Sequence, residues 1–404
     1  MTNFDRQEVL LRVENLSQHF KSLKAVDDVS FEVKRGEVFG LVGESGCGKT
    51  TTGRSILRIY DITGGSIYFK GHRICAGTLE YNKAIREAKA ELKKLNGSDA
   101  VRAAELKKII ADNRGKRKAA QHDHANSDKE YARELVEELK RQYEKDKEAA
   151  AGDADALKRL KRKLHEEVRV AKKTRLITKI QMIFQDPVAS LNPRMTVQEI
   201  IAEGLVINGI KDKDYIQEKV YEILELVGLT REHAGRYPHE FSGGQKQRIG
   251  IARSVIMQPD MIIADEPVSA LDVSVQAQVI NLLNDLRDQL GLTILFIAHD
   301  LSVVKYFSDR IGVMYFGKMV ELATSEELFA HPLHPYTRSL LSSIPLPDPK
   351  SEQKRKRITY NPLESHDYSV DKPTMREVVP GHFVMCNDKE YAEYKALLRA
   401  ESGN

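Results

Sequence analysis

The sequence has few cysteines, no long apolar run and little net charge. Its three cysteines, Cys47, Cys75 and Cys386, lie far apart in 404 residues, which predicts neither a disulfide framework nor a zinc site and fits a reducing compartment. No apolar run approaches the roughly 18 residues that a membrane span needs, and the polar start "MTNFDRQEV" argues against a secretory signal. The formal net charge of +4 is too small to indicate nucleic-acid binding by itself. We therefore expect a soluble protein, or one that sits on a membrane by holding another protein.

A charged segment divides the chain. On both sides of it, strand-like runs such as "EVFGLVG" and "TILFIAH" alternate with helix-like runs, including residues 197–229, which predicts a mixed α/β fold. Residues 77–177 are instead rich in Ala, Lys, Glu, Arg and Leu and contain no proline. Apolar stripes there predict three or four amphipathic helices folded back on one another, with arms of about 30 Å and breaks at residues 96–99, 121–128 and 151–155. A solvated, partly disordered segment is the alternative. From about Pro345, prolines and charges favour a loosely packed tail.

The stretch "GESGCGKT" follows an apolar strand and precedes a helix-like run, which is the context of a phosphate-binding P-loop. Its glycines allow a tight loop whose backbone N–H groups are directed at phosphate oxygens. The helix that begins near Lys49 adds its positive end. Lys49 supplies a charge for the β- and γ-phosphates, the Thr50 hydroxyl can ligate Mg²⁺, and Cys47 is interpreted as a small loop residue rather than a nucleophile. The stretch predicts nucleotide binding.

Polar side chains at the ends of other predicted strands complete a nucleotide site. Asp265 can hold Mg²⁺, and the adjacent Glu266 can polarise an attacking water as a general base. His299 ends the next apolar strand and can reach a γ-phosphate, although a lone histidine is more often structural. Gln185, at another strand end, can meet Mg²⁺ and water without adding charge. Phe20 precedes the P-loop and could stack on adenine, with ordinary packing as the alternative.

A second glycine-rich loop, "FSGGQKQR", occupies residues 241–248, just before a helix-like run. The ordered set "GESGCGKT", "IFQDP", "FSGGQKQR", "IIADEPVSALD" and "IAHD" resembles the ATP-binding-cassette (ABC) ATPases. The resemblance implies an α/β fold of the P-loop NTPase type, with a RecA-like core and antiparallel β and α-helical subdomains. It also implies an ATPase domain at residues 8–75 and 178–330 and a C-terminal extension at 331–404. The charged helical hairpin module at 77–177 is an insert that the usual cassette lacks, and it is expected to project from the core.

The resemblance further implies roles for individual residues. In that family two cassettes meet head to tail, and each ATP lies between the P-loop of one chain and the signature loop of the other. Asp272 would communicate across this interface, while Glu266, His299 and Gln185 match the catalytic glutamate, the switch histidine and the glutamine of the catalytic site. The signature-loop residues, which would grip the partner's ATP, are Ser242, Gly243, Gly244 and Gln245. The residues implied to bind this chain's own ATP are Phe20, Gly43, Glu44, Ser45, Gly46, Cys47, Gly48, Lys49, Thr50 and Thr51, and the implied Mg²⁺ ligands are Thr50, Gln185 and Asp265.

Two longer stretches narrow the resemblance. "IFQDPVASLNPRMTV" and "HPLHPYTRSLLSSIPLPDP" are similar to the ATP-binding subunits of bacterial oligopeptide and dipeptide importers, and more to the second, F-type ATPase. This implies ATP hydrolysis that powers peptide import at the cytoplasmic face of the cell membrane. The implied partners are a second, D-type ATPase subunit, two integral membrane permeases and an extracytoplasmic peptide-binding protein, with no nucleic acid. By the same analogy the residues after Gln185 touch the permeases.

Two other functions compete with peptide import. An importer of nickel or another small solute, from the same subfamily, is the nearer alternative. A coil-bearing DNA-repair ATPase fits less well, because its coil follows the glutamine loop whereas residues 77–177 precede Gln185.

Overall fold

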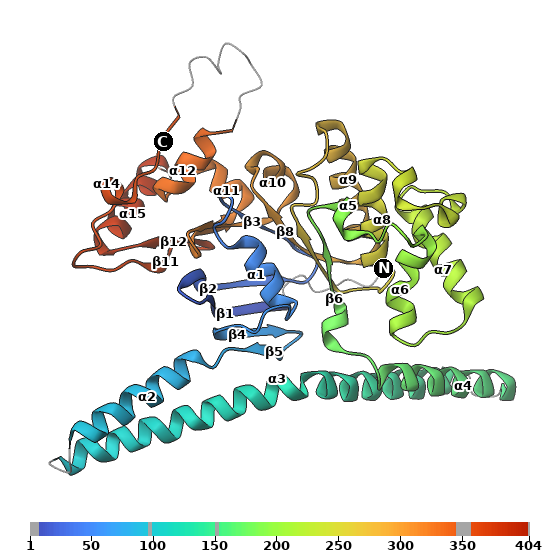
Figure 1. Ribbon diagram of the computed structural model, residues 1–404, viewed down its shortest axis with the longest axis horizontal. Coiled ribbons are helices and arrows are strands. Elements are labelled where there is room, and N and C mark those ends of the chain that lie inside the picture. The colour runs from blue at the N-terminus through green and yellow to red at the C-terminus, as the bar shows by residue number, and fades with distance from the viewer. Residues whose placement is uncertain (1–7, 96–98, 150–152, 345–356, 403–404) are drawn as a thin grey trace.

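The computed structural model describes residues 8–95, 99–149, 153–344 and 357–402. Its strands are β1 (Val9–Phe20), β2 (Leu23–Lys34), β3 (Val38–Val42), β4 (Gly64–Phe69), β5 (His72–Ala76), β6 (Ile180–Ile183), β7 (Met261–Asp265), β8 (Thr293–Ala298), β9 (Arg310–Tyr315), β10 (Lys318–Thr324), β11 (Thr374–Val379) and β12 (His382–Cys386). In the described residues they form an eight-stranded sheet, in the order β11-β12-β10-β9-β3-β8-β7-β6, and a four-stranded antiparallel sheet, in the order β2-β1-β4-β5 (Figure 1).

The parallel part of the large sheet forms the centre of the molecule. Strands β9, β3, β8, β7 and β6 pair in parallel, and every residue of β3, β7 and β8 is buried. Continuous apolar runs are typical of strands covered on both faces, so the strand predictions for these runs are confirmed. In β3, Val38 and Val42 belong to one apolar cluster, whereas Phe39 and Leu41 face a second cluster shared with the small sheet. The carboxyl ends of these strands meet at one edge, where the candidate site lies.

Helices lie on several sides of the two sheets (Figure 1). They are α1 (Lys49–Ile56), α2 (Leu79–Lys94), α3 (Ala100–Ala149), α4 (Ala154–Ala171), α5 (Pro187–Ser190), α6 (Val197–Ile207), α7 (Lys213–Leu226), α8 (Gly243–Val255), α9 (Val273–Leu290), α10 (Leu301–Phe307), α11 (Ser325–Ala330), α12 (Pro335–Ser342), α14 (Pro362–Ser365) and α15 (Asp388–Ser402), with 3-10 helices η1 (Leu176–Lys179), η2 (Arg231–Gly235) and η3 (Pro238–Glu240). Helices α5–α8 form a helical subdomain beside β6 (Figure 1). The helical run predicted at 197–229 is two helices, because Gly209, with φ of 84°, follows α6 and Asp212 caps α7. Within the described ranges, no helix combines the length and the apolar character needed to cross a membrane.

The charged segment folds as three helices, of which the middle one is very long. The prediction that the apolar stripes of the first two helices fold back on one another is confirmed, since Ile85 and Ala88 of α2 form a small buried cluster with Leu106 and Ile110 of α3. The break predicted at 121–128 is wrong, because α3 runs through it without interruption for 50 residues, about 75 Å at ~1.5 Å per residue. The predicted arms of about 30 Å are therefore too short for α3. The breaks predicted at 96–99 and 151–155 separate these helices, and residues 96–98 and 150–152 lie outside the described residues.

The centre of α3 is docked on the small sheet, and α2 and α4 extend along α3 toward opposite ends (Figure 1). Tyr131 is buried in the apolar cluster of that sheet. Asp128 accepts a hydrogen bond from the backbone N–H of Leu176 at 2.9 Å, and Glu134 lies 2.9 Å from His72. The polar residues that suggested a break thus serve as docking contacts. The insert is anchored at its middle, rather than simply projecting from the core.

The described residues after Pro345 do not form the loosely packed tail that their composition suggests. Strands β11 and β12 extend the large sheet from β10, and α15 covers them. Val378, Val384, Cys386, Tyr394 and Leu398 form a buried apolar cluster there. Residues 345–356, which hold several of the prolines and charges behind that prediction, lie outside the described part of the chain.

Candidate functional site

The P-loop adopts a backbone that only glycine fits at two positions. Gly43 has φ of 147°, and a Cβ there would lie 2.2 Å from the carbonyl oxygen of Met314. Gly48 has φ of 106°, and a Cβ there would lie 2.3 Å from the carbonyl oxygen of Ala25. Both backbone conformations are costly for residues with side chains. The loop is therefore held tightly between β9 and β2, and it leads directly into the N-terminus of α1.

The ammonium group of Lys49 lies inside this loop. Its Nζ donates to the carbonyl oxygen of Gly43 at 2.7 Å and to that of Glu44 at 2.9 Å, and the residue is 4% exposed. Cys47 lies beside it, with Sγ 3.7 Å from Nζ. Burial raises the pKa of the Cys47 thiol, and the nearby Lys49 charge only partly offsets this. A neutral buried thiol fits the interpretation of Cys47 as a small loop residue.

The first turn of α1 is tied to the end of β7. Thr50 Oγ1 donates to Asp265 Oδ1 at 2.8 Å. Burial raises the pKa of Asp265, while the hydrogen bond from Thr50 and the charge of Arg54 lower it. A buried carboxylate next to a hydroxyl is a pair of hard oxygen donors, which is the donor type that Mg²⁺ prefers. The pair therefore fits a Mg²⁺ ion, whose charge would compensate the buried carboxylate.

Three strand ends converge on the carboxylate of Glu266. Gln185 Nε2 donates to Glu266 Oε2 at 3.0 Å, and His299 Nδ1 lies 3.1 Å from the same oxygen. Glu266 has φ of 45°, in the left-handed region, and its N–H is held by the carbonyl oxygen of Ile297 at 2.9 Å. Strained backbone of this kind is found at functional sites. The arrangement directs a carboxylate toward the P-loop and fixes it from two sides.

These groups enclose one cavity of about 590 Å³. Phe20 forms part of its wall, is 40% exposed and meets Tyr60 edge-on at a ring-centroid distance of 5.2 Å, so one face of Phe20 remains available to a flat ligand. The predicted residues that line the cavity are Phe20, Ser45, Gly46, Gly48, Lys49, Thr50, Thr51, Gln185, Glu266 and His299. Three others, Gly43, Glu44 and Cys47, contact Lys49, and Asp265 contacts Thr50. Sequence motifs up to about 280 residues apart thus meet at one place.

The signature loop is the exception. Among the described residues that line this cavity, none comes from residues 241–248. Ser242 caps α8: its Oγ accepts the N–H of Gln245 at 3.3 Å, and Gln245 Oε1 accepts the N–H of Ser242 at 3.0 Å. A Cβ on Gly244 would lie 2.5 Å from Val275, near the start of α9, which Asp272 caps. The loop is therefore a separate, exposed helix N-terminus on the same chain.

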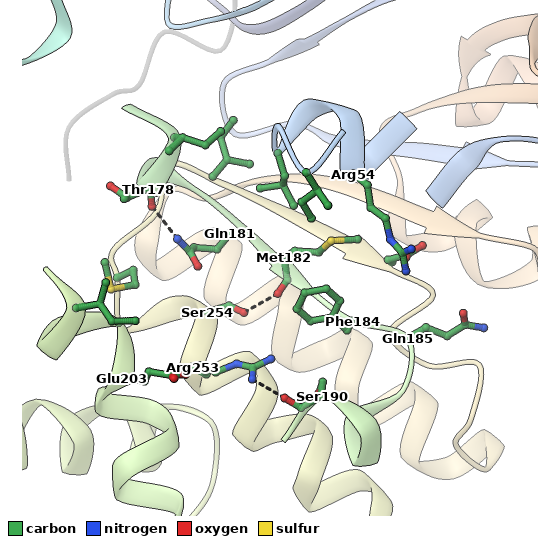
Figure 2. A pocket seen from close by; sticks show the side chains of 18 of the residues that line it. Arg54, Thr178, Gln181, Met182, Phe184, Gln185, Ser190, Glu203, Arg253 and Ser254 are labelled. Carbon is green, nitrogen blue, oxygen red and sulfur yellow. Dashed lines mark hydrogen bonds between the residues drawn. The ribbon is translucent and has the colours of Figure 1, made fainter. Parts of the chain in front are cut away.

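A second cavity, of about 840 Å³, lies between β6 and the helical subdomain (Figure 2). Gln185 lines this cavity as well as the first, so it connects the two. Arg253 Nη1 donates to the carbonyl oxygen of Ser190 at 2.6 Å, and burial lowers the pKa of Arg253 although Glu203 lies nearby. Phe184 contributes an apolar wall. Sequence reasoning assigned no role to these three residues: Phe184 stands in the quoted "IFQDP" but only Gln185 was interpreted there, and Glu203 and Arg253 stand outside the quoted motifs.

Comparison with known proteins gives family matches over most of the chain. The family described as "ABC transporter" matches residues 26–157 and 151–269, and the family described as "Oligopeptide/dipeptide transporter, C-terminal region" matches residues 320–370. The chain is 46% identical over 395 residues to the oligopeptide transport ATP-binding protein OppF of Bacillus subtilis, covering 96% of this chain and 99% of that protein. It is 44% identical over 375 residues to the dipeptide transport ATP-binding protein DppF of Lactococcus lactis, covering 92% and 90%.

Solved structures support the fold. The structure of cbiO1 from Clostridium perfringens, part of the ABC transporter complex cbiONQ, is similar with a TM-score of 0.52 at 21% identity, covering 80% of this chain and 92% of that chain. The ATP-binding cassette MJ1267 gives a TM-score of 0.52 at 21% identity, covering 83% and 99%. At this identity the likeness concerns the fold alone, and it confirms the predicted α/β cassette with its antiparallel and helical subdomains.

Proposed function

The chain belongs to the ABC transporter family, and from that premise we propose that it is the ATP-hydrolysing subunit of a transporter that imports oligopeptides or dipeptides. One observation carries the enzymatic part: Lys49, Thr50 and the Gln185–Glu266–His299 cluster line a single cavity, and Asp265 is hydrogen-bonded to Thr50 at its edge. The peptide substrate rests on the relatives that are named for oligopeptide and dipeptide transport, and on the matched C-terminal region. The same names favour peptides over nickel.

We assign the steps of ATP hydrolysis to this chain's own groups. The N–H groups of the P-loop and the Lys49 ammonium bind the β- and γ-phosphates. Mg²⁺, held by Thr50, Asp265 and Gln185, would neutralise charge on the phosphate oxygens. Gln185 Nε2 and His299 Nδ1 both lie within hydrogen-bond distance of Glu266 Oε2. Oε1 of Glu266 would then accept the proton of the attacking water. Phe20 stacks on the adenine.

We propose that a second ABC ATPase subunit, of the D-type, completes the ATP site of this chain. The exposed N-terminus of α8 offers unpaired backbone N–H groups and a positive end, which suit an anionic phosphate. Because Ser242, Gly243, Gly244 and Gln245 lie away from this chain's own P-loop cavity, they would bind the γ-phosphate held by the partner. Asp272, at the start of the adjacent α9, would contact the same interface. ATP binding then favours the closed dimer, and hydrolysis releases it.

The second cavity is proposed to receive the permeases. It opens beside Gln185, so a permease segment seated there would adjoin a residue of the ATP site. Its wall combines apolar side chains with Arg253 and Glu203, a combination that suits a short amphipathic helix. The chain would thus work at the cytoplasmic face of the membrane with two permeases and an extracytoplasmic peptide-binding protein.

The test is peptide uptake by the reconstituted transporter, with wild-type chain or the Glu266→Gln variant. Glu266→Gln keeps the side-chain shape but cannot accept a proton. We expect ATP binding to persist, while ATP hydrolysis and peptide uptake each fall at least about 100-fold. Peptide uptake at the wild-type rate in the variant would contradict the proposal that ATP hydrolysis by this chain powers peptide import. If the wild-type assembly takes up nickel but not peptide, the transporter is a nickel importer rather than a peptide importer.

A further inference from the structure

The peptide group between Gly43 and Glu44 is held at both ends. Its carbonyl oxygen, on Gly43, accepts from Lys49 Nζ at 2.7 Å. Its N–H, on Glu44, donates to the hydroxyl of Tyr336 at 3.0 Å. Tyr336 lies 292 residues further along the chain. The orientation of this peptide plane therefore decides whether Lys49 Nζ has two carbonyl acceptors, on Gly43 and Glu44, or only the one on Glu44.

Tyr336 is a rigid anchor. It is 1% exposed, and its ring lies against Tyr315 and Tyr360 at centroid distances of 4.4 and 5.6 Å. Its backbone N–H donates to His334 Nδ1 at 3.1 Å, which caps α12. A buried tyrosine in such a cluster has little freedom to move, and burial raises its pKa, so the hydroxyl stays neutral. The hydroxyl is therefore a fixed acceptor for the P-loop.

The position of Tyr336 is set by the C-terminal part of the chain. The buried carboxylate of Glu321, on β10, accepts the N–H of Leu333 at 2.7 Å and that of His334 at 3.1 Å. The same carboxylate lies 2.8 Å from His382 Nε2, on β12. These contacts fix the start of α12 to the extended end of the sheet. A continuous set of hydrogen bonds thus runs from β12 to the P-loop.

We propose that Tyr336 is a positioning residue for ATP binding: its hydroxyl fixes the Gly43–Glu44 peptide so that the carbonyl faces Lys49 and holds the ammonium at the phosphate site. If the peptide reversed, its N–H would face the cation, which is unfavourable. Glycine adopts φ values of either sign, so the backbone of Gly43 alone does not fix the orientation of the peptide that follows it. The C-terminal region thereby sets the affinity for ATP. This inference rests on the proposed binding of ATP at the P-loop.

The test is ATP affinity of the Tyr336→Phe variant, measured by titration of the intact chain with a fluorescent ATP analogue and Mg²⁺. Loss of one hydrogen bond of about 1 kcal/mol corresponds to a Kd about fivefold higher. Tyr360→Phe is the matched control: it removes a hydroxyl from the same aromatic cluster and leaves the ring contacts, so its Kd should equal that of the wild type. A Tyr336→Phe Kd within twofold of the wild type overturns the inference. A wild-type chain that binds no ATP overturns the proposed function instead.

A second comparison separates positioning from general destabilisation. If Tyr336 acts through Lys49, removing the ammonium makes the hydroxyl irrelevant. In the Lys49→Ala background, Tyr336→Phe should then change the Kd for ATP by less than twofold. In the wild-type background the same substitution should raise the Kd about fivefold. An equal change in both backgrounds shows that Tyr336 merely supports the fold, and this also overturns the inference.

Discussion

Two substitutions of Ser242 separate its role in the fold from its proposed role in a partner's ATP site. In the isolated chain Ser242 Oγ caps α8 by accepting the N–H of Gln245. Ser242→Ala removes that acceptor, which costs about 1 kcal/mol of stability. Ser242→Asp keeps an acceptor and adds a negative charge at a helix N-terminus, so its free energy of unfolding should equal or exceed that of the wild type.

In the assembled transporter the order of the two variants should reverse: Ser242→Asp, the more stable variant, should hydrolyse ATP more slowly than Ser242→Ala. A carboxylate at residue 242, placed ~4 Å from one phosphate charge, is repelled by about 4 kcal/mol at an effective dielectric constant of about 20. This corresponds to a loss of about 1000-fold in ATP turnover at the site that the loop completes, whereas Ser242→Ala should retain part of the activity.

The measurements are chemical denaturation of the isolated chain and ATP hydrolysis by the assembled transporter. The control is ATP affinity of the isolated chain, which should be unchanged in both variants because Ser242 does not line its own P-loop cavity. If activity instead follows stability, with Ser242→Asp more active than Ser242→Ala, Ser242 acts only as a helix cap.

Two further predictions concern buried ionisable groups. Burial raises the pKa of Asp265, so its negative charge opposes folding at neutral pH. Asp265→Asn can still accept the hydrogen bond from Thr50, so the nucleotide-free variant should resist denaturant better than the wild type, while Mg²⁺-dependent ATP hydrolysis should be abolished. A variant that resists denaturant less well than the wild type would contradict this. Burial alone would lower the pKa of His382, but the hydrogen bonds and charges of Glu321 and Glu327 outweigh it and raise the pKa. The stabilisation from protonated His382 should be complete below about pH 6.5 and be lost as pH rises through the raised value. The protection of the β12 amides, measured as hydrogen exchange relative to the base-catalysed intrinsic rate, should therefore fall at alkaline pH in the wild type and depend less on pH in His382→Gln; an equal fall in both would contradict this.

The catalytic cluster could be predicted from the sequence because each of its residues follows a strongly apolar strand. Parallel strands that are neighbours in a sheet bring their carboxyl ends together. Asp265 and His299 were therefore expected near each other, and the structure places their strands, β7 and β8, side by side with β3 next to β8. The P-loop glycines were predictable as well, because the motif itself shows where the tight loop needs residues without a side chain. These features depend on short-range patterns, and the structure brings their residues together as expected.

Features that depend on long-range packing could not be predicted. The polar run at 121–128 has the composition of a break, yet Ser127 is buried and Asp128 holds the N–H of Leu176, so the helix continues through it. Nothing near Tyr336 in the sequence indicates that its hydroxyl reaches Glu44. The prolines and charges after Pro345 likewise concealed two strands, because β12 is stabilised by pairing with β10, and β11 by pairing with β12, rather than by a strong pattern of their own.

The central claim is that this chain's signature loop closes on a partner's ATP. Its most direct test is the reactivity of Ser242→Cys toward a thiol reagent in the Glu266→Gln background. Because the three native cysteines are buried and Ser242 is exposed, the reagent should report on residue 242. Val101→Cys is the control, since Val101 is 74% exposed on the inserted module. Mg²⁺ and ATP should strongly slow the modification of residue 242 in the assembled transporter. They should leave the modification rate unchanged in the isolated chain and at Val101→Cys. Modification of the ATP-loaded assembly at the same rate as the isolated chain would contradict the account.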